Sequence, residues 1–289
     1  MATLKAIRRR IASVRSTQQI TRAMKLISAA RLRRAQEALL NARPYHEALK
    51  RVADSVLHTA PEVIAPAENA ASKMLIIVVA ADRGLAGGYN INLLRLAEEE
   101  ARRGRSAGRE AEFFAVGRKA LDHFRRTHQP LAGERVNNLP RLATVGLAHQ
   151  IGQLVLAQWR SGAICEAGLV YNVFRSALSQ RPTYEKLLPI ETPGENGAAP
   201  PPASDYLVEP SPAELVPEVL RRYVEAAILH ALLEAEASEH GARMTAMDAA
   251  TNNAVEMIER LTLEMNRVRQ AAITKELMDI VGGAEALRG

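Results

Sequence analysis

The chain has 289 residues, of which 47% are hydrophobic and 24% are charged, a composition typical of folded proteins and not of disordered ones. Its single cysteine, Cys165, cannot form an internal disulfide, and its longest apolar run, 74–81, is far shorter than the roughly 20 residues of a membrane span. The net charge of +6 is unevenly divided: residues 1–59 hold 13 Lys and Arg against 3 Asp and Glu, whereas residues 205–289 hold 8 against 15. The two ends are therefore oppositely charged, and each has a sign that can attract a partner.

Residues 1–59 are predicted to form one long coiled-coil helix, because no glycine precedes Gly84 and no proline precedes Pro44. Apolar residues first recur with the 3–4 spacing of a coiled-coil seam, at Leu4, Ile7, Ile11 and Val14. The next in-phase positions are polar: Gln18, Thr21, Lys25 and Ser28. Apolar residues in this stretch run one position out of phase, at Ile20, Met24 and Ile27. We interpret this as an apolar stripe that shifts sideways for about two turns before the first phase returns at Leu32.

Residues 72–190 are predicted to form a globular α/β domain of Rossmann-like type. Buried-strand patterns are expected at 74–81, 112–117 and 168–174, and helical patterns at 90–103, 118–128 and 145–160. The alternation of strands and helices predicts a mostly parallel sheet with helices on its faces. Residues 191–209 are expected to be a loop with a short strand at 206–208, and another short strand is expected at 187–190.

Residues 210–289 are predicted to form a second coiled-coil helix. Ser211 and Glu214 suggest a capping box at its start, Gly282-Gly283 suggests its end, and Thr3 is the expected N-cap of the first helix. Its seam runs through Met244, Met247, Thr251, Ala254, Ile258, Leu261, Met265, Val268 and Ala272. Helices of roughly 80 and 100 Å exceed a compact globule whose radius of gyration would be about 19 Å. The fold expected is therefore an α/β body from which an antiparallel coiled coil of the two terminal helices projects.

The sequence supplies no positive argument for catalysis or for a bound cofactor. The turn 82–88 follows a strand, as phosphate-binding turns do, but it has neither the G-x-G-x-x-G nor the G-x-x-x-x-G-K-[ST] spacing. We interpret it as a tight turn whose glycines permit positive φ and close helix packing, with a nucleotide enzyme as a weak alternative. The seven histidines show no i, i+4 pair, and no nucleophile motif is present. Catalytic, cofactor-binding and metal residues are all expected to be absent.

A second hypothesis comes from the basic N-terminal segment, which has no acidic residue before Glu37. Such a helix could belong to a basic coiled-coil adaptor that binds nucleic acid or an acidic protein. No aromatic side chain stands among its arginines, so base stacking is not available and only phosphate contacts would remain.

Several strings resemble the gamma subunit of bacterial F-type ATP synthases. The N-terminal strings are IRRRI at 7–11, TQQITRAMK at 17–25 and RPY at 43–45; the central strings are DRGLAGGYN at 82–90, VYN at 170–172 and LSQRP at 178–182, the last like a loop after the family's central strand. The C-terminal strings are ASEHGARMTAM at 237–247, RQAAITKE at 269–276 and IVGGA at 280–284. The resemblance covers residues 4–287 in order and is weakest at 99–145.

The resemblance implies a central rotor shaft that couples proton flow through the membrane sector to ATP synthesis or hydrolysis at the beta subunits. Its expected partners are the alpha and beta subunits, the epsilon subunit and the c-subunit ring, with no nucleic acid and with the membrane reached only through the complex. The implied location is peripheral, on the cytoplasmic face of the bacterial inner membrane. Ala86 stands where many members of the family carry cysteine, so no thiol chemistry is implied for that turn.

The resemblance also implies partner-contact residues. Those expected to contact the alpha/beta ring are Met24, Lys25, Arg269, Gln270, Thr274 and Glu276. Those expected in the foot, near epsilon and the c-ring, are Arg83, Gly84, Gly87, Gly88 and Tyr206. The polar in-phase residues from Gln18 to Ser28 are interpreted as a surface that faces changing partners.

Overall fold

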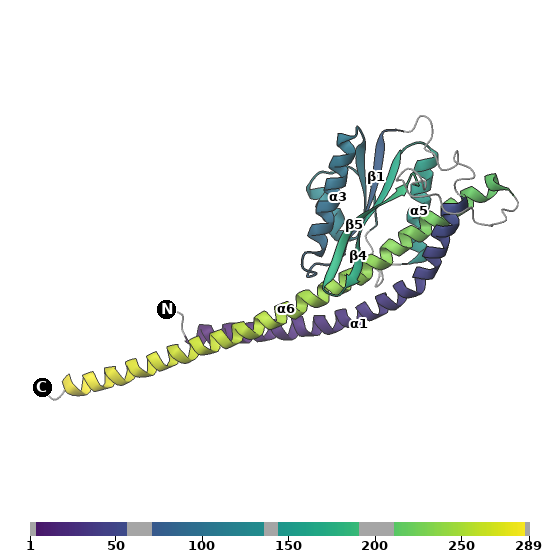
Figure 1. Cartoon of the computed structure of the whole chain (residues 1–289). Coiled ribbons are helices and arrows are strands. Elements are labelled where there is room, and N and C mark those ends of the chain that lie inside the picture. The colour runs from purple at the N-terminus through teal and green to yellow at the C-terminus, as the bar shows by residue number, and fades with distance from the viewer. Residues whose placement is uncertain (1–3, 57–70, 136–143, 191–210, 287–289) are drawn as a thin grey trace. The chain divides into compact units, whose positions relative to one another are not determined.

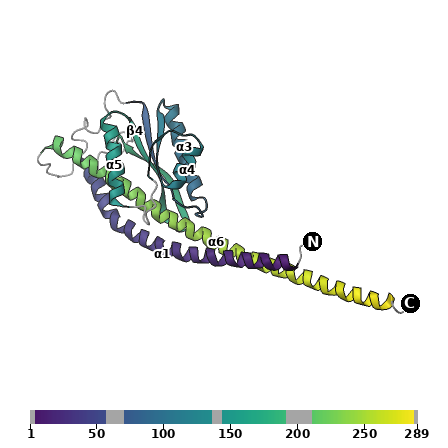
Figure 2. The same ribbon diagram turned by 180° about the vertical axis from the view of Figure 1, so that it is seen from behind.

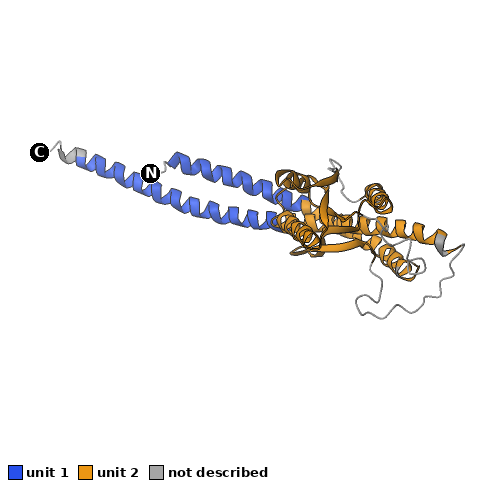
Figure 3. Cartoon of the chain, turned by 90° about the horizontal axis from the view of Figure 1, so that it is seen from above, with its two compact units in different colours: residues 1–27, 244–289 blue, residues 28–243 orange. Residues whose placement is uncertain are grey.

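The computed structural model describes residues 4–56, 71–135, 144–190 and 211–286. The elements in chain order are α1 (Leu4–Val56), β1 (Lys73–Val79), α3 (Tyr89–Ser106), β2 (Glu110–Val116), α4 (Arg118–Arg126), β3 (Leu131–Arg135), α5 (Val145–Arg160), β4 (Glu166–Ser176), β5 (Ser179–Leu188) and α6 (Pro212–Ala286). The chain forms two compact units (Figure 3), unit 1 from residues 1–27 and 244–289 and unit 2 from residues 28–243. Both long helices contribute to both units, so the division runs through α1 and α6.

Unit 2 is built on one five-stranded sheet with the order β3-β2-β1-β4-β5 (Figure 1). β1 pairs in parallel with β2 and β4, β2 pairs in parallel with β3, and β5 is antiparallel to β4. In the register of the central strands, Ile76 lies between Phe113 and Gly168. The predicted mostly parallel sheet is confirmed, and the strand β3 is an addition that the sequence did not indicate.

Helices cover both faces of this sheet (Figure 2). Because successive strand residues point to opposite faces, Ile76 and Val78 pack with α3 and α4, whereas Ile77 and Val79 pack with α5 and the unit 2 parts of α1 and α6. These four side chains are fully buried. A strand that is apolar on both faces requires such a double covering, which explains why β1 reads as a continuous apolar run.

The hairpin of β4 and β5 differs from the expected loop at 178–182 and short strand at 187–190. Residues 179–188 form one edge strand, in which Pro182 pairs with Asn172. Proline has no N–H to donate, but an edge strand has a free side and tolerates it, so Pro182 does not interrupt the strand. The ring of Tyr184 lies over Gly168, where an added Cβ would come within 2.2 Å of it, and the Tyr184 hydroxyl donates to Glu166 Oε1 at 2.7 Å.

The ends of the helices agree only in part with what the sequence predicts. At the start of α6, the Glu214 N–H donates to Ser211 Oγ at 3.4 Å, and the Ser211 hydroxyl donates to the Glu214 carboxylate at 3.2 Å. The capping residues are therefore those expected, but the carboxylate does not bond the Ser211 backbone. Gly282-Gly283 does not end α6, which continues to Ala286. Thr3 and the strand expected at 206–208 lie outside the described residues.

Candidate partner-contact sites

The seam of unit 1 keeps a single phase along α1 and does not shift sideways as predicted. Thr21 is buried with 8% of its surface exposed, whereas Ile20 and Ile27 are 57% and 54% exposed. Ser28, a later in-phase residue at the start of the unit 2 part of α1, is also buried. The polar residues therefore occupy the seam and do not form the outward surface that was predicted, and of the out-of-phase apolar residues Ile20 and Ile27 lie outside and Met24 is partly buried.

The polar seam residues are bonded across the two helices. Lys25 Nζ donates to Asp248 Oδ1 at 2.6 Å, with 39% and 46% of the two side chains exposed. Thr251 Oγ1 donates to Thr21 Oγ1 at 2.8 Å, and Thr21 Oγ1 donates to the Gln18 carbonyl at 3.0 Å. These contacts run in opposite sequence directions, which makes α1 and α6 antiparallel within unit 1.

The other predicted ring contacts lie further along α6. The seam of α6 is recognisable from the buried Met247 to the partly buried Val268, and Ala272, expected as its last member, is exposed. Every residue of 269–282 is exposed, including the four predicted contacts Arg269, Gln270, Thr274 and Glu276. Met24 is partly buried, and Lys25 is held by Asp248. The structure thus exposes four of the six residues, leaves Met24 partly buried and ties Lys25 to α6.

In unit 2 the turn between β1 and α3 carries four of the five predicted foot residues. Arg83, Gly87 and Gly88 are exposed, and Gly84 is partly exposed. The guanidinium of Arg243 on α6 donates to the carbonyl of Arg83 at 3.2 Å and to that of Gly84 at 3.3 Å. Two other side chains fix the ends of the turn: Asn90 Oδ1 accepts from the Ala81 N–H at 3.0 Å, and Asp82 Oδ1 accepts from the Arg118 N–H at 2.9 Å. Tyr206 lies outside the described residues.

The backbone of this turn explains only part of its glycine content. Gly87 has a positive φ of 57°, as expected, but Gly88 has a φ of −80°. Leu85 has a φ of 63°, a conformation that costs a residue with a side chain more than it costs glycine. Gly117 after β2 has a φ of 93°, and a Cβ there would lie 2.1 Å from the Ala80 carbonyl. The closest backbone approach at this edge of the sheet is therefore at Gly117, outside the motif.

Buried titratable groups lie on α6 next to this turn. Burial raises the pKa of Glu239, against the lowering effect of Arg243, whose Nη1 lies 2.6 Å from Glu239 Oε1. Burial, with smaller effects of Arg243 and Arg31, lowers the pKa of His240 to about 4. Burial also raises the pKa of Tyr89, whose hydroxyl donates to the Ala235 carbonyl at 3.2 Å. Of these groups, Tyr89 at the start of α3 bonds across to α6, whereas Glu239 pairs with Arg243, the residue of α6 that bonds the turn.

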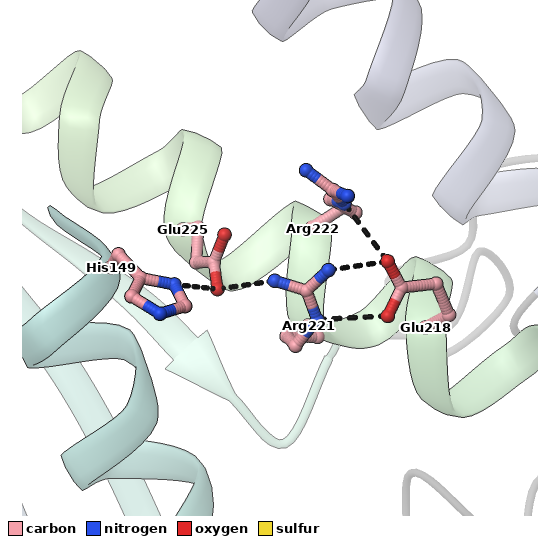
Figure 4. Close-up of polar contacts among 5 residues, drawn as sticks. All are labelled: His149, Glu218, Arg221, Arg222 and Glu225. Atoms are coloured by element: carbon pink, nitrogen blue, oxygen red, sulfur yellow. Dashed lines mark hydrogen bonds and ion pairs between the residues drawn. The ribbon is translucent and has the colours of Figure 1, made fainter. Parts of the chain in front are cut away.

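A second polar cluster joins α5 to α6 (Figure 4). One carboxylate oxygen of Glu225 lies between His149 Nδ1 at 2.8 Å and Arg221 Nη1 at 2.7 Å. Arg221 and Arg222 both donate to Glu218, and these bonds lower the pKa of Glu218 to about 2. Because the Glu218 end of the cluster is largely exposed, its contribution to the free energy of unfolding is small. The cluster ties two helices together and presents no reactive arrangement.

Two bonding residues, Asp248 and Arg243, were not singled out from the sequence. Arg243 lies within a motif string, but nothing local indicates that it bonds a turn about 160 positions earlier. Asp248 directly follows the seam residue Met247, and the in-phase Lys25 on the opposite helix is the signal that could have found it. Among the described residues no cluster of three or more His, Cys, Asp or Glu could hold a metal ion, and no described helix is long and apolar enough to cross a membrane.

Comparison with known proteins identifies the family. The model of the family described as ATP synthase matches residues 3–287. The chain is 48% identical over 289 residues to the ATP synthase gamma chain of Pelotomaculum thermopropionicum, covering 99% of this chain and 100% of that relative. It is 45% identical over 292 residues to the ATP synthase gamma chain of Moorella thermoacetica, covering 100% of both.

A solved structure shares the fold. A chain of the Euglena gracilis mitochondrial ATP synthase rotor superimposes with a TM-score of 0.63 at 19% identity, covering 93% of this chain and 98% of that chain. The matches confirm the predicted fold and the predicted resemblance, which implies a non-catalytic subunit of its complex, and give no support to a nucleic-acid adaptor. The chain belongs to the family of ATP synthase gamma chains.

Proposed function

We propose that this chain transmits rotation between a proton-translocating membrane sector and the beta subunits of a bacterial F-type ATP synthase, with unit 1 inside the ring of alpha and beta subunits. It has no catalytic residues of its own in this proposal. The beta subunits carry out the chemistry, and the shaft changes their nucleotide-binding states as it turns. The complex is membrane-bound, and the chain lies on its cytoplasmic side.

The observation that carries this proposal is the exposed end of α6 in unit 1. Four apolar side chains at Ile273, Leu277, Ile280 and Val281 are 50% to 68% exposed. Exposed apolar side chains that recur along one helix indicate a surface that a partner covers. A sleeve of alpha and beta subunits around this helix supplies such a cover.

Two sets of contacts follow from this placement. Met24, Lys25, Arg269, Gln270, Thr274 and Glu276 contact the ring, and the exposure of the last four supports that role. In the foot, Arg83, Gly84, Gly87, Gly88 and Tyr206 lie near epsilon and the c-ring. The exposed turn 82–88, fixed by Arg243, supports a rigid contact there.

Co-expression with alpha and beta subunits tests the proposal. The expected product is a complex with one copy of this chain per ring, in which sustained ATP hydrolysis requires the chain. The matched comparison is a chain truncated after Val268, which keeps the paired seam and lacks the exposed end of α6. It should assemble less stably and hydrolyse ATP more slowly. A ring that neither binds the full chain nor responds to it would refute the proposal.

A further inference from the structure

We propose that Asp248 and Thr251 are positioning residues, which hold the polar stripe of α1 against α6 and so turn Ile20, Met24 and Ile27 outward as the surface that the shaft presents to the ring. This inference rests on the proposed function, since it specifies which face of α1 meets the alpha and beta subunits. It also gives Lys25 a partner inside the shaft.

The geometry of the two contacts supports this role. Lys25 and Thr21 are four residues apart on α1 and therefore lie on one face of the helix, and their partners Asp248 and Thr251 are three residues apart on α6. The bonds of 2.6 Å and 2.8 Å fasten two successive turns of the helix pair. Among the described residues of unit 1, Lys25–Asp248 is the one ion pair between the helices.

The face that α1 turns toward α6 is not the one that burial of apolar side chains alone would favour. Turning α1 about its axis by one residue position would bring Ile20 and Ile27 into the seam, and burial of two isoleucines is favourable. The structure instead leaves both more than half exposed and buries Thr21. A polar residue at a coiled-coil seam fixes register at a cost in stability, because its partner is satisfied in one register alone. Here the two polar contacts select the register in which Thr21 and Lys25 face α6.

The out-of-phase stripe, in which Ile20 and Ile27 are more than half exposed and Met24 is partly buried, has the spacing of a contact surface. Ile20, Met24 and Ile27 follow one another at intervals of four and three residues, so they form one line along α1. Around the helix axis, this line lies one residue position away from the seam. We expect it to face the wall of the alpha/beta ring, since the proposed function places unit 1 inside that ring. Loss of the polar contacts would free α1 to turn this line toward α6.

A charge exchange separates this role from a direct contact between Lys25 and the ring. The single variants Lys25→Asp and Asp248→Lys and the double variant Lys25→Asp/Asp248→Lys are compared in the complete complex reconstituted into vesicles. The readouts are ATP hydrolysis and the number of protons pumped per ATP. Each single variant should lower the pumping ratio by about two- to fivefold, the factor that corresponds to the measured range for half-exposed ion pairs. The double variant should restore the part of the loss that comes from the broken pair and should pump better than Lys25→Asp alone.

The control is Asp122→Lys, which makes the same charge change as Asp248→Lys at an exposed position of α4, outside unit 1, and should leave the pumping ratio unchanged. A double variant as defective as Lys25→Asp, together with a normal Asp248→Lys variant, would show that Lys25 acts only through its own contact with the ring and not through Asp248, and would overturn the inference. Normal pumping in all variants would overturn it as well. Failure of the proposed function looks different, because the wild-type chain itself would then neither assemble nor pump.

A cross-linking pair tests the facing of α1 independently of activity. In a Cys165→Ala background, Thr21→Cys/Thr251→Cys should form a disulfide on mild oxidation, since the two hydroxyls touch. The matched pair Ile20→Cys/Thr251→Cys should not, because Ile20 faces outward. The cross-linked complex should still pump, as both helices belong to the same rotor. Preferential cross-linking of the Ile20 pair would refute the observed register.

Discussion

One helix, α6, lies in two contrasting environments. In unit 2 its residues 216–243 are buried on most sides by α1, α5 and the sheet, and Val216, Leu232 and Ala235 have no exposed surface. In unit 1 its residues 244–282 bury one narrow stripe, and much of the remainder is exposed. The same backbone conformation therefore serves as a core element in one unit and as a contact surface in the other. Stability should depend on the chain's own packing in unit 2 and on outside partners in unit 1.

The strongest test of this contrast places a carboxylate in each environment. Leu232→Asp puts a charge into a site with no exposed surface and should destabilise unit 2 by about 5 kcal/mol, enough to prevent folding. Leu263→Asp in unit 1, where the side chain is 70% exposed, should change the unfolding free energy by less than about 0.5 kcal/mol. Urea denaturation followed by circular dichroism measures both. Similar losses from the two changes would refute the contrast.

A helix-breaking change should show that damage in unit 1 stays local. Met247→Pro removes a backbone hydrogen bond at a buried seam position and should cost about 3 kcal/mol. Hydrogen exchange should then quicken in residues 4–27 and 244–268, while the strands of unit 2 keep their protection. Met247→Leu preserves size and should cost less than about 1.5 kcal/mol. Loss of protection in β1 would show that the two units unfold together.

Acid sensitivity should belong to unit 2, because all seven histidines lie within residues 28–243. Burial, aided by His46 and Arg43, lowers the pKa of His230 to about 4, below its unfolded value of about 6.5. Between these values the unfolded chain binds more protons, so the free energy of unfolding falls as pH falls, by about 3 kcal/mol for this group. Above pH 6.5, His230 no longer changes the free energy of unfolding, because it is neutral in both the folded and the unfolded chain.

The variant His230→Phe keeps a ring that can stack on His46, whose centroid lies 4.4 Å away, and removes the titration. It should flatten part of the acid limb in urea titrations from pH 7 to 4, because His240, with a pKa also lowered to about 4, and His46, whose pKa is lowered by burial, remain. Glu234 acts with the opposite sign, since burial raises its pKa and favours the folded state as pH falls. An unchanged acid limb in the variant would remove His230 from the explanation.

The smallest effect is expected at the hydroxyl contact of unit 1. Thr251→Val keeps the shape and removes the bond to Thr21, whose hydroxyl retains its bond to the Gln18 carbonyl. The expected loss is below about 1 kcal/mol, because no buried group is left without a partner. Thr262→Val, which removes only a bond to the Ile258 carbonyl within α6, is the matched control in the same denaturation assay. A loss above about 2 kcal/mol from Thr251→Val would mean that the seam is more rigid than its exposure indicates.

Local patterns predicted the elements whose signals are local. The apolar run of β1, the helix α5 at 145–160 and the two long helices were all located within a few residues. β3 was missed because Leu131–Arg135 has neither alternation nor a β-branched residue, and it forms only by pairing with β2. α6 passes through Gly282-Gly283 because two glycines lower helix propensity without forbidding the conformation.

The surroundings of the predicted contact residues could likewise be predicted only where the signal is local. The exposure of Glu276 could be anticipated from a predicted seam that ends at Ala272, and that of Arg269 from its place between the seam positions Val268 and Ala272. The facing of Lys25 could not, because hydrophobicity alone favours burying Ile20 and Ile27, and the deciding partner, Asp248, lies 223 positions away. Arg243 is hidden for the same reason, since its bonds to the turn depend on long-range packing.

The Tyr184 ring seated over Gly168 has a consequence for how this protein can change over evolutionary time. A methyl group at residue 168 would overlap the ring, so alanine is acceptable there only after Tyr184 has become smaller. A smaller residue at 184, however, removes the hydroxyl that bonds Glu166 and leaves a hollow over the glycine. Each single step is therefore worse than either end point, and the two positions should be inherited as a pair.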